Sequence, residues 1–304
     1  MVTMSPRIVF MGSPDFALPS LRALVKWYPL VGVVTQPDRQ AGRGRRLGSP
    51  PVKRLAFELS IPVIQPDSLR SPEVMEQLRG WGADLIVVAA FGQILRPEVL
   101  DLPRFGCINV HASLLPRWRG AAPIQACLLA GDEQTGVTIM RMDAGVDTGP
   151  MLHQFAIPIA PDDTAGTLSE KLSSLGADLL IETLPDYLSG ELQPQPQEDS
   201  QATYASMLNK KDGRLDFNHP ADELARRVRA FNPWPGAWMA WRGEPLKIHW
   251  AHVVPGKADP GRVLVHQGQP ALGTTEGLLV LDEVQPAGKK PMPGKAFLVG
   301  ARDW

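Results

Sequence analysis

The first 110 residues alternate between short apolar runs rich in β-branched residues and stretches in which apolar residues recur at helical spacing. The runs are expected to be strands, and the helical patterns lie between them. Apolar strands separated by helices are typical of a parallel sheet covered on both faces. The expected strands are Arg7–Met11, Leu30–Thr35, Ile61–Ile64, Asp84–Ala90 and Cys107–Val110, and the expected helices are Phe16–Trp27, Val52–Leu59 and Ser71–Trp81.

Beyond this region the regular alternation of strands and helices ends. Two further strands are expected at Gly136–Met142 and Met151–Ile157, followed by a long helix from about Thr164 to Leu188. Residues 190–200 are polar, rich in proline and without period, which predicts a linker. After a helix at Ala221–Phe231, turn-separated strands predict a small β-barrel. These strands are Ala237–Trp241, Leu246–Val254, Arg262–Val265, Ala271–Thr274 and Leu278–Glu283.

The predicted fold class is therefore α/β, with a mostly parallel sheet followed by a smaller β domain. We expect a catalytic domain at residues 1–189, a linker at 190–208 and a C-terminal domain at 209–304.

Composition narrows the class of protein. With 44% hydrophobic and 21% charged residues among 304, the chain is typical of globular proteins, which excludes disordered and coiled-coil classes. The longest apolar run, residues 85–91, is far short of the roughly 20 residues that cross a bilayer, so no membrane association is expected. The N-terminus carries no secretory pattern, which favours the cytoplasm. Two cysteines, Cys107 and Cys127, indicate neither a disulfide framework nor a metal site.

Charge is unevenly distributed along the chain. Residues 1–208 carry 17 basic and 22 acidic side chains, whereas residues 209–304 carry 14 and 10, which gives net charges of −5 and +4. A basic island also interrupts the acidic part. Such asymmetry points toward a polyanionic partner, although on charge alone solvated basic faces are the simpler explanation. The island consists of Arg39, Arg43, Arg45, Arg46, Lys53 and Arg54.

The turn after the first expected strand argues against nucleotide cofactors. Gly12-Ser13-Pro14-Asp15 stands where a dinucleotide fold requires G-x-G-x-x-G, and no P-loop motif occurs in the chain. A nicotinamide-linked oxidoreductase is therefore disfavoured.

Two polar motifs carry candidate chemistry. Side chains alternate across a strand, so Asn109 and His111 point to the same side of the strand that ends there. The Gly-flanked loop 142–150 adds two carboxylates, Asp143 and Asp147. An amide, an imidazole and a carboxylate supply an oxyanion donor, a proton acceptor and an orienting group. The alternative is structural: the amide and imidazole cap the strand, and each aspartate forms a turn.

Several motifs together resemble the folate-dependent formyltransferase family, from about residue 6 to Lys290. They are Phe10–Phe16, Gln36-Pro37-Asp38 with the following Gly-Arg cluster, Asn109-Val110-His111 with Ser113–Pro116, Arg117–Pro123, Asp143–Gly149 and Phe231–Pro235. The basic island and the C-terminal domain make the chain similar to the members of this family that act on tRNA.

The resemblance implies a Rossmann-like formyltransferase domain, an OB-like barrel, 10-formyltetrahydrofolate as co-substrate without a metal, and methionyl initiator tRNA as the formyl acceptor. It implies catalytic roles for Asn109, His111 and Asp147. It further implies folate contacts at Ser113, Leu114, Leu115, Pro116, Phe91, Gly92 and Gln93, and tRNA contacts at Arg39, Arg43, Arg45 and Arg46. After Lys290 no family pattern matches.

Two alternatives remain open at this point. A formyltransferase acting on a small-molecule amine shares the chemistry but needs neither the basic island nor a basic barrel. An RNA-binding module without catalysis leaves Asn109, His111 and Asp147 without a function.

Overall fold

The computed structural model describes residues 5–41, 46–301 and 303–304, and the chain divides into two compact units. The first unit comprises Met1–Gly120, Thr135–Ile157 and Ser169–Tyr204. The second comprises Ala121–Gln134, Pro158–Leu168 and Ala205–Trp304. The boundaries expected at residues 189 and 209 stay predictions.

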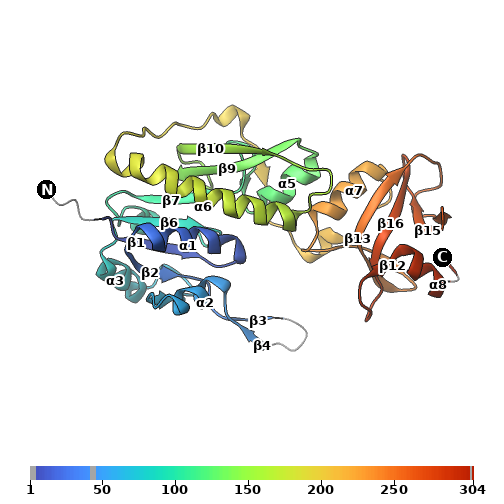
Figure 1. The fold of residues 1–304 in the computed structure, drawn as a ribbon, viewed down its shortest axis with the longest axis horizontal. Coiled ribbons are helices and arrows are strands. Elements are labelled where there is room, and N and C mark those ends of the chain that lie inside the picture. The colour runs from blue at the N-terminus through green and yellow to red at the C-terminus, as the bar shows by residue number, and fades with distance from the viewer. Residues whose placement is uncertain (1–4, 42–45, 302) are drawn as a thin grey trace. The chain divides into compact units, whose positions relative to one another are not determined.

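The first unit is built on a seven-stranded sheet with the order β10-β9-β7-β6-β1-β2-β5 (Figure 1). The pairs of β1 with β2 and β6, of β6 with β7 and of β2 with β5 are parallel, and β7 pairs with β9 antiparallel. The predicted mostly parallel sheet is confirmed. Its strands are β1 (Ile8–Gly12), β2 (Leu30–Val34), β5 (Val63–Ile64), β6 (Leu85–Ala89), β7 (Cys107–His111), β9 (Gln134–Arg141) and β10 (Met151–Pro158).

Helices cover both faces of this sheet, as the apolar strands predict. Figure 1 shows α1 and α6 crossing one face, where Gly176 of α6 lies so close to Val110 that a Cβ atom would collide with its side chain. On the other face, apolar residues of α3 and α4 pack in one cluster with those of β1, β6 and β7. The helices are α1 (Leu18–Trp27), α2 (Pro51–Glu58), α3 (Pro72–Trp81), α4 (Pro97–Leu100) and α6 (Ala165–Ser189), with the 3-10 helix η1 (Asp15–Ala17) before α1.

A hairpin leaves the sheet after β2. Strands β3 (Arg39–Ala41) and β4 (Arg46–Gly48) pair antiparallel, with Arg39 opposite Gly48. The sequence predicted only a loop here, because glycines and arginines give no alternation of apolar and polar residues. We refer to residues 39–48 as the basic hairpin.

The second unit contains an antiparallel sheet with the order β12-β13-β16-β15-β14. Its core joins apolar residues of these strands to Leu224 and Val228 of one helix. The elements are α5 (Pro123–Ala130), α7 (Ala221–Ala230), β12 (Ala237–Trp241), β13 (Glu244–Val254), β14 (Val263–His266), β15 (Gln269–Gly273), β16 (Leu278–Gln285) and β17 (Met292–Pro293), which pairs with β16.

The last residues close this second core, although no sequence pattern assigned them a role. Helix α8 (Gly294–Gly300) inserts Phe297 between Trp241 and Trp304, with ring centroids 4.9 and 5.3 Å apart. The Trp304 indole donates to the Leu264 carbonyl at 2.9 Å. The remaining short elements are β8 (Arg119–Gly120), β11 (Tyr204–Ala205), η2 (Asp199–Gln201) and η3 (Lys210–Gly213). Within the described ranges, no helix is long and apolar enough to cross a membrane.

Candidate active site

The carboxyl end of β7 carries two polar side chains on one face, as strand alternation predicts. Asn109 is half-buried and His111 is 5% exposed, whereas Ile108 and Val110 are buried on the opposite face. β7 is held in register by β6, which is parallel to it, and by β9, which is antiparallel, so the separation of the amide and the imidazole is fixed by the sheet. This edge is where open α/β sheets bind ligands.

Asp147 completes the cluster from the loop between β9 and β10. The Asn109 amide donates to Asp147 Oδ1 at 3.3 Å, and His111 Nδ1 lies 3.6 Å from the same oxygen. The backbone N–H of Gly120 donates to Asp147 Oδ2 at 2.9 Å. We call Asn109, His111 and Asp147 the Asn–His–Asp cluster.

The second ring nitrogen of His111 indicates how the imidazole is protonated. His111 Nε2 lies 3.0 Å from the carbonyl oxygen of Trp118. A carbonyl only accepts hydrogen bonds, so Nε2 is assigned the proton, and Nδ1 is left as the basic nitrogen of the neutral ring. The Trp118 carbonyl therefore orients the ring. A proton taken up at Nδ1 would face the Asp147 carboxylate.

The structure separates the two aspartates that the sequence left as alternatives. Asp143 Oδ1 accepts from the Gly145 N–H at 3.0 Å and from the Thr148 hydroxyl at 2.7 Å, so this side chain holds its own turn. Asp147 instead turns toward β7 with a φ of +53°. Gly149 lies so close to the Arg141 carbonyl that any side chain would collide with it.

The segment expected to contact folate after His111 is fixed by internal hydrogen bonds. Ser113 is 1% exposed, and its hydroxyl donates to the Arg117 carbonyl at 2.7 Å. The Leu115 N–H donates to the Thr138 hydroxyl at 3.1 Å. Leu115 is buried, whereas Leu114 and Pro116 are partly exposed. These last two side chains are the ones that could offer apolar surface to a ligand.

The second expected folate segment follows β6. Phe91 is 2% exposed, and its carbonyl accepts from the Gln36 amide at 3.1 Å. Gly92 has a φ of +81°, which favours glycine, and turns the chain toward Gln93. The Gln93 amide donates to the Pro66 carbonyl at 3.0 Å.

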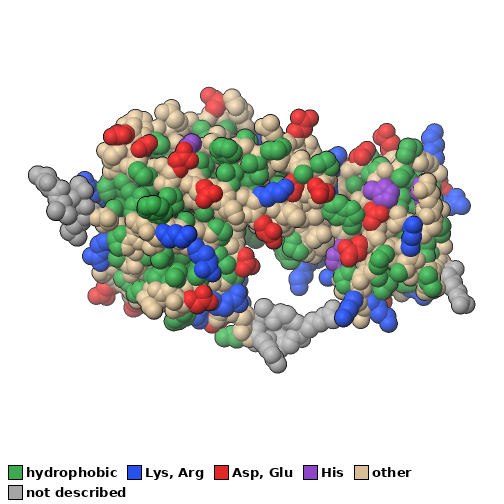
Figure 2. Space-filling view, in the orientation of Figure 1, with side chains coloured by type: hydrophobic (Ala, Val, Ile, Leu, Met, Phe, Trp, Pro, Cys, Tyr) green, Lys and Arg blue, Asp and Glu red, His purple; other side chains and the backbone are tan. Residues whose placement is uncertain are grey.

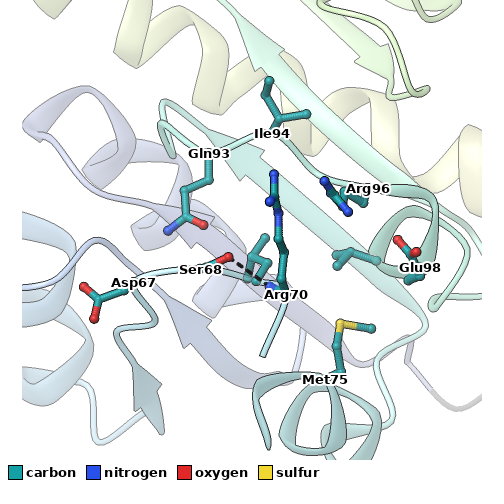
Figure 3. Close-up of a pocket in the computed structure, with 10 residues that line it drawn as sticks. Asp67, Ser68, Arg70, Met75, Gln93, Ile94, Arg96 and Glu98 are labelled. Atoms are coloured by element: carbon teal, nitrogen blue, oxygen red, sulfur yellow. Dashed lines mark hydrogen bonds between the residues drawn. The ribbon is translucent and has the colours of Figure 1, made fainter. Parts of the chain in front are cut away.

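A pocket of about 560 Å³ adjoins this segment (Figure 3). Figure 3 shows the side chains of Arg70 and Arg96 together in it, with Gln93 on one side and Glu98 on the other. Neither guanidinium makes an ion pair among the described residues. Of the seven expected folate contacts, Gln93 alone lines this pocket; the lining is Asp67, Ser68, Leu69, Arg70, Met75, Gln93, Ile94, Arg96, Glu98 and Val99.

The four arginines expected to contact tRNA belong to the basic hairpin. Arg39 is exposed and donates to the Gln36 side chain at 3.1 Å. Arg43 and Arg45 lie outside the described residues, and the side chain of Arg46, in β4, lies outside the description as well. Figure 2 shows Lys and Arg side chains gathered where the hairpin leaves the first unit.

One charge of the basic island has a structural partner. Lys53 Nζ lies 2.7 Å from Asp38 Oδ2, and the Gln65 amide donates to Asp38 Oδ1 at 2.7 Å. The hydrogen bonds from Lys53 and Gln65 lower the pKa of Asp38. Asp38 thus fixes the base of the hairpin, and Lys53 contributes less free positive charge than the sequence suggested.

Arg119 is a functional candidate that sequence reasoning missed. Its side chain is 2% exposed, donates from Nε to Gln197 at 2.9 Å and pairs from Nη2 with Asp199 at 2.7 Å. Burial alone would lower its pKa, but hydrogen bonds to Asp199 and Tyr204 raise it. Its partners Gln197 and Asp199 lie in the polar segment 190–200, which has no periodicity and so gave no sign of the contact.

Both cysteines are free thiols that lie buried. Burial raises the pKa of the Cys107 thiol to about 12, so it is protonated at neutral pH and is not a nucleophile. Cys127 is also buried. Across the described part of the chain, no group of three or more His, Cys, Asp or Glu side chains could hold a metal ion.

Comparisons with known proteins find matches along nearly the whole chain. Residues 7–184 match the family model of formyl transferase, and residues 207–302 match that of the formyl transferase C-terminal domain. The chain is 52% identical over 303 residues to methionyl-tRNA formyltransferase of Halorhodospira halophila, covering 98% of this chain and 97% of that protein. It is 50% identical over 299 residues to methionyl-tRNA formyltransferase of Chloroflexus aggregans, covering 97% of each.

A solved structure shares the fold at low identity. The N-formyltransferase from Helicobacter canadensis, crystallised with folinic acid and dTDP-3-aminofucose, superposes with a TM-score of 0.67 at 18% identity. The match covers 93% of this chain and all of that one.

Proposed function

The chain belongs to the formyl transferase family, and we propose that it transfers a formyl group from 10-formyltetrahydrofolate to the α-amino group of methionyl initiator tRNA. The observation that carries the proposal is the Asn–His–Asp cluster at the sheet edge. It occurs in a chain about half identical, over nearly its full length, to proteins named methionyl-tRNA formyltransferase.

The chemistry follows from the three side chains. The methionyl amine attacks the formyl carbon, and negative charge develops on the formyl oxygen. Asn109 gives one amide N–H to Asp147, which leaves the other for this oxygen. His111 takes the proton of the attacking nitrogen at Nδ1, and the nearby Asp147 carboxylate balances the resulting charge. The proton passes to the folate nitrogen as the C–N bond breaks, and no covalent enzyme intermediate is needed.

Support for the donor site comes from the pocket beside Gln93. Tetrahydrofolates end in a glutamate whose carboxylates are negatively charged at neutral pH. Asp67 and Glu98 also line this pocket, but among the described residues neither the Arg70 nor the Arg96 guanidinium makes an ion pair, and arginine pairs with carboxylates through parallel hydrogen bonds. We therefore assign the donor's acidic tail to the pocket and its formyl-bearing end to the cluster, with Ser113–Pro116 and Phe91–Gln93 along the way.

The acceptor site rests on charge. In the sequence, Arg39, Arg43, Arg45 and Arg46 fall in one short segment, and residues 209–304 have a net charge of +4. Arginine side chains bind phosphates without reading sequence, which suits the acceptor stem of a tRNA. We assign the antiparallel second unit as an OB-like barrel that contacts the same tRNA, and we place the enzyme in the cytoplasm, where charged tRNAs occur.

Formyl transfer can be measured directly with purified protein and 10-formyltetrahydrofolate. We expect formylation of Met-tRNA and none of free methionine or of aminosugar nucleotides. Transfer to a small amine at a rate equal to that for Met-tRNA would contradict the proposal and support the alternative acceptor. The donor assignment is checked in the same assay, because Arg70→Ala should raise the KM for the folate and leave that for Met-tRNA unchanged.

A further inference from the structure

Gln197 lies beside the Asp147 loop, and both the NH₂ group and the oxygen of its side-chain amide are hydrogen-bonded. Its Nε2 donates to the Asp147 carbonyl at 2.8 Å and to the Gly149 carbonyl at 2.7 Å, while its Oε1 accepts from Arg119 Nε. Gln197 is half-buried and Arg119 is almost fully buried. The catalytic loop is thus tied to a side chain 50 residues further along the chain.

The chemistry of the partners fixes which way this amide points. A guanidinium only donates hydrogen bonds, so the Gln197 oxygen must face Arg119 and the NH₂ group must face the loop. Asp199 holds the other side of the guanidinium at 2.7 Å. The buried charge therefore orients the amide, and the amide presents two donors to the loop carbonyls.

The loop needs such support at Asp147. The φ of +53° is unusual for a residue other than glycine and persists only where neighbouring contacts hold it. The carboxylate is held from one side by the Gly120 N–H, and the carbonyl of the same residue is held from the other by Gln197. Arg119 and Gly120 are consecutive, so one short stretch, β8, controls both anchors.

We infer that Gln197, oriented by Arg119, is a positioning residue that fixes the distance between the Asp147 carboxylate and the Asn109 and His111 side chains during formyl transfer. This inference rests on the proposed function. Misplacing a catalytic group by about 1 Å can cost roughly 10²-fold in rate. Loss of the two donors should therefore lower kcat by about 10- to 100-fold, with KM values for both substrates within about twofold of wild type.

Two variants and one control separate positioning from packing. Gln197→Leu removes the amide, whereas Gln197→Glu keeps its size and its bond to Arg119 but cannot donate to the two carbonyls. Both variants should lose kcat. If Gln197 only supported the fold, Gln197→Glu would keep the wild-type kcat. That result would overturn the inference. Gln201→Leu, at an exposed position on the same segment, is the matched control and should behave as wild type.

Coupling to Arg119 is tested by a double variant. Arg119→Lys keeps the charge but loses the fork that holds both Asp199 and Gln197. If Arg119 acts through Gln197, adding Arg119→Lys to Gln197→Leu should lower kcat by no more than about twofold further. Multiplicative losses would show that the two residues act separately and would overturn this part of the inference.

Hydrogen exchange decides the inference without any activity measurement. The Gly120 amide should be protected in the wild type and in Gln201→Leu, and should exchange about tenfold faster or more in Gln197→Leu and Gln197→Glu. Equal exchange in all four proteins would overturn the inference, as would a loss expressed in KM alone. Absence of formyl transfer by the wild-type chain would instead contradict the proposed function, and the exchange result would still stand.

Discussion

The Asn–His–Asp cluster and the basic hairpin both lie beyond strand ends of the same sheet, yet they are built in different ways. In the cluster, His111 is 5% exposed, and its partner Asp147 lies 36 residues further along the chain, held by a hydrogen bond from Gly120. In the hairpin, Arg39 is exposed and bonds to a residue three positions away. This difference fits the proposed roles, because bond making requires fixed geometry, whereas charge on a local element is sufficient to bind a phosphate backbone.

This difference predicts which kinetic parameter depends on each region. Residues of the cluster are proposed to stabilise the transition state, so their loss should lower kcat. Hairpin residues are proposed to bind the ground state of the tRNA, so their loss should raise KM and change the salt dependence. The following variants test that division.

The largest effects are expected on β7. His111→Ala removes the proton acceptor and Asn109→Ala removes an oxyanion donor, so each should lower kcat by about 10²–10³-fold. Donor binding, followed by folate fluorescence quenching, should change by less than about threefold because neither side chain lines the pocket. Near wild-type turnover in either folded variant would remove the cluster from the mechanism.

A smaller loss is expected in the adjoining loop, and here the chain supplies its own control. Asp147→Asn removes the charge that faces His111 and should lower kcat by about 10²-fold. Asp143→Asn keeps an oxygen for its local turn and should change kcat by less than about threefold. Equal effects in steady-state kinetics would mean that the structure does not distinguish the two aspartates functionally.

The smallest change in kcat is expected in the hairpin. Arg43→Ala should raise the KM for Met-tRNA several-fold, leave the KM for folate unchanged, and flatten the dependence of log(kcat/KM) on log[salt] by about one unit. Arg79→Ala, an exposed arginine on α3, is the control and should leave the slope unchanged. An unchanged slope in Arg43→Ala would indicate that the hairpin does not contact tRNA phosphates, and would favour a small-molecule amine as the acceptor.

The periodicity of apolar residues predicted those features that depend only on neighbouring residues in the chain. The placement of Asn109 and His111 on one face followed from strand alternation, and the parallel sheet followed from apolar runs between helices. The sequence could not choose between Asp143 and Asp147 on physical grounds, since either suits a turn. Their difference depends on a backbone N–H from residue 120, which no pattern in the loop encodes.

Features that depend on contacts between distant residues were missed for the same reason. Gln197 stands in a polar segment, and the hydrogen bonds of its side chain reach 48 to 78 residues back along the chain. Helix α8 spans seven residues, too short for a helical period to stand out, and its role became clear only from the packing of Phe297 between two tryptophans. The basic hairpin was detected by charge, but its paired strands were not.

If Asn109, His111 and Asp147 act as one unit, as proposed, a double variant should reveal their coupling. We would measure kcat/KM for Met-tRNA in wild type, His111→Ala, Asp147→Asn and the double variant under identical salt. Because Asp147 is proposed to act through His111, the double variant should be no more than about threefold slower than His111→Ala alone. Losses that multiply would contradict the account and show that the two residues contribute independently.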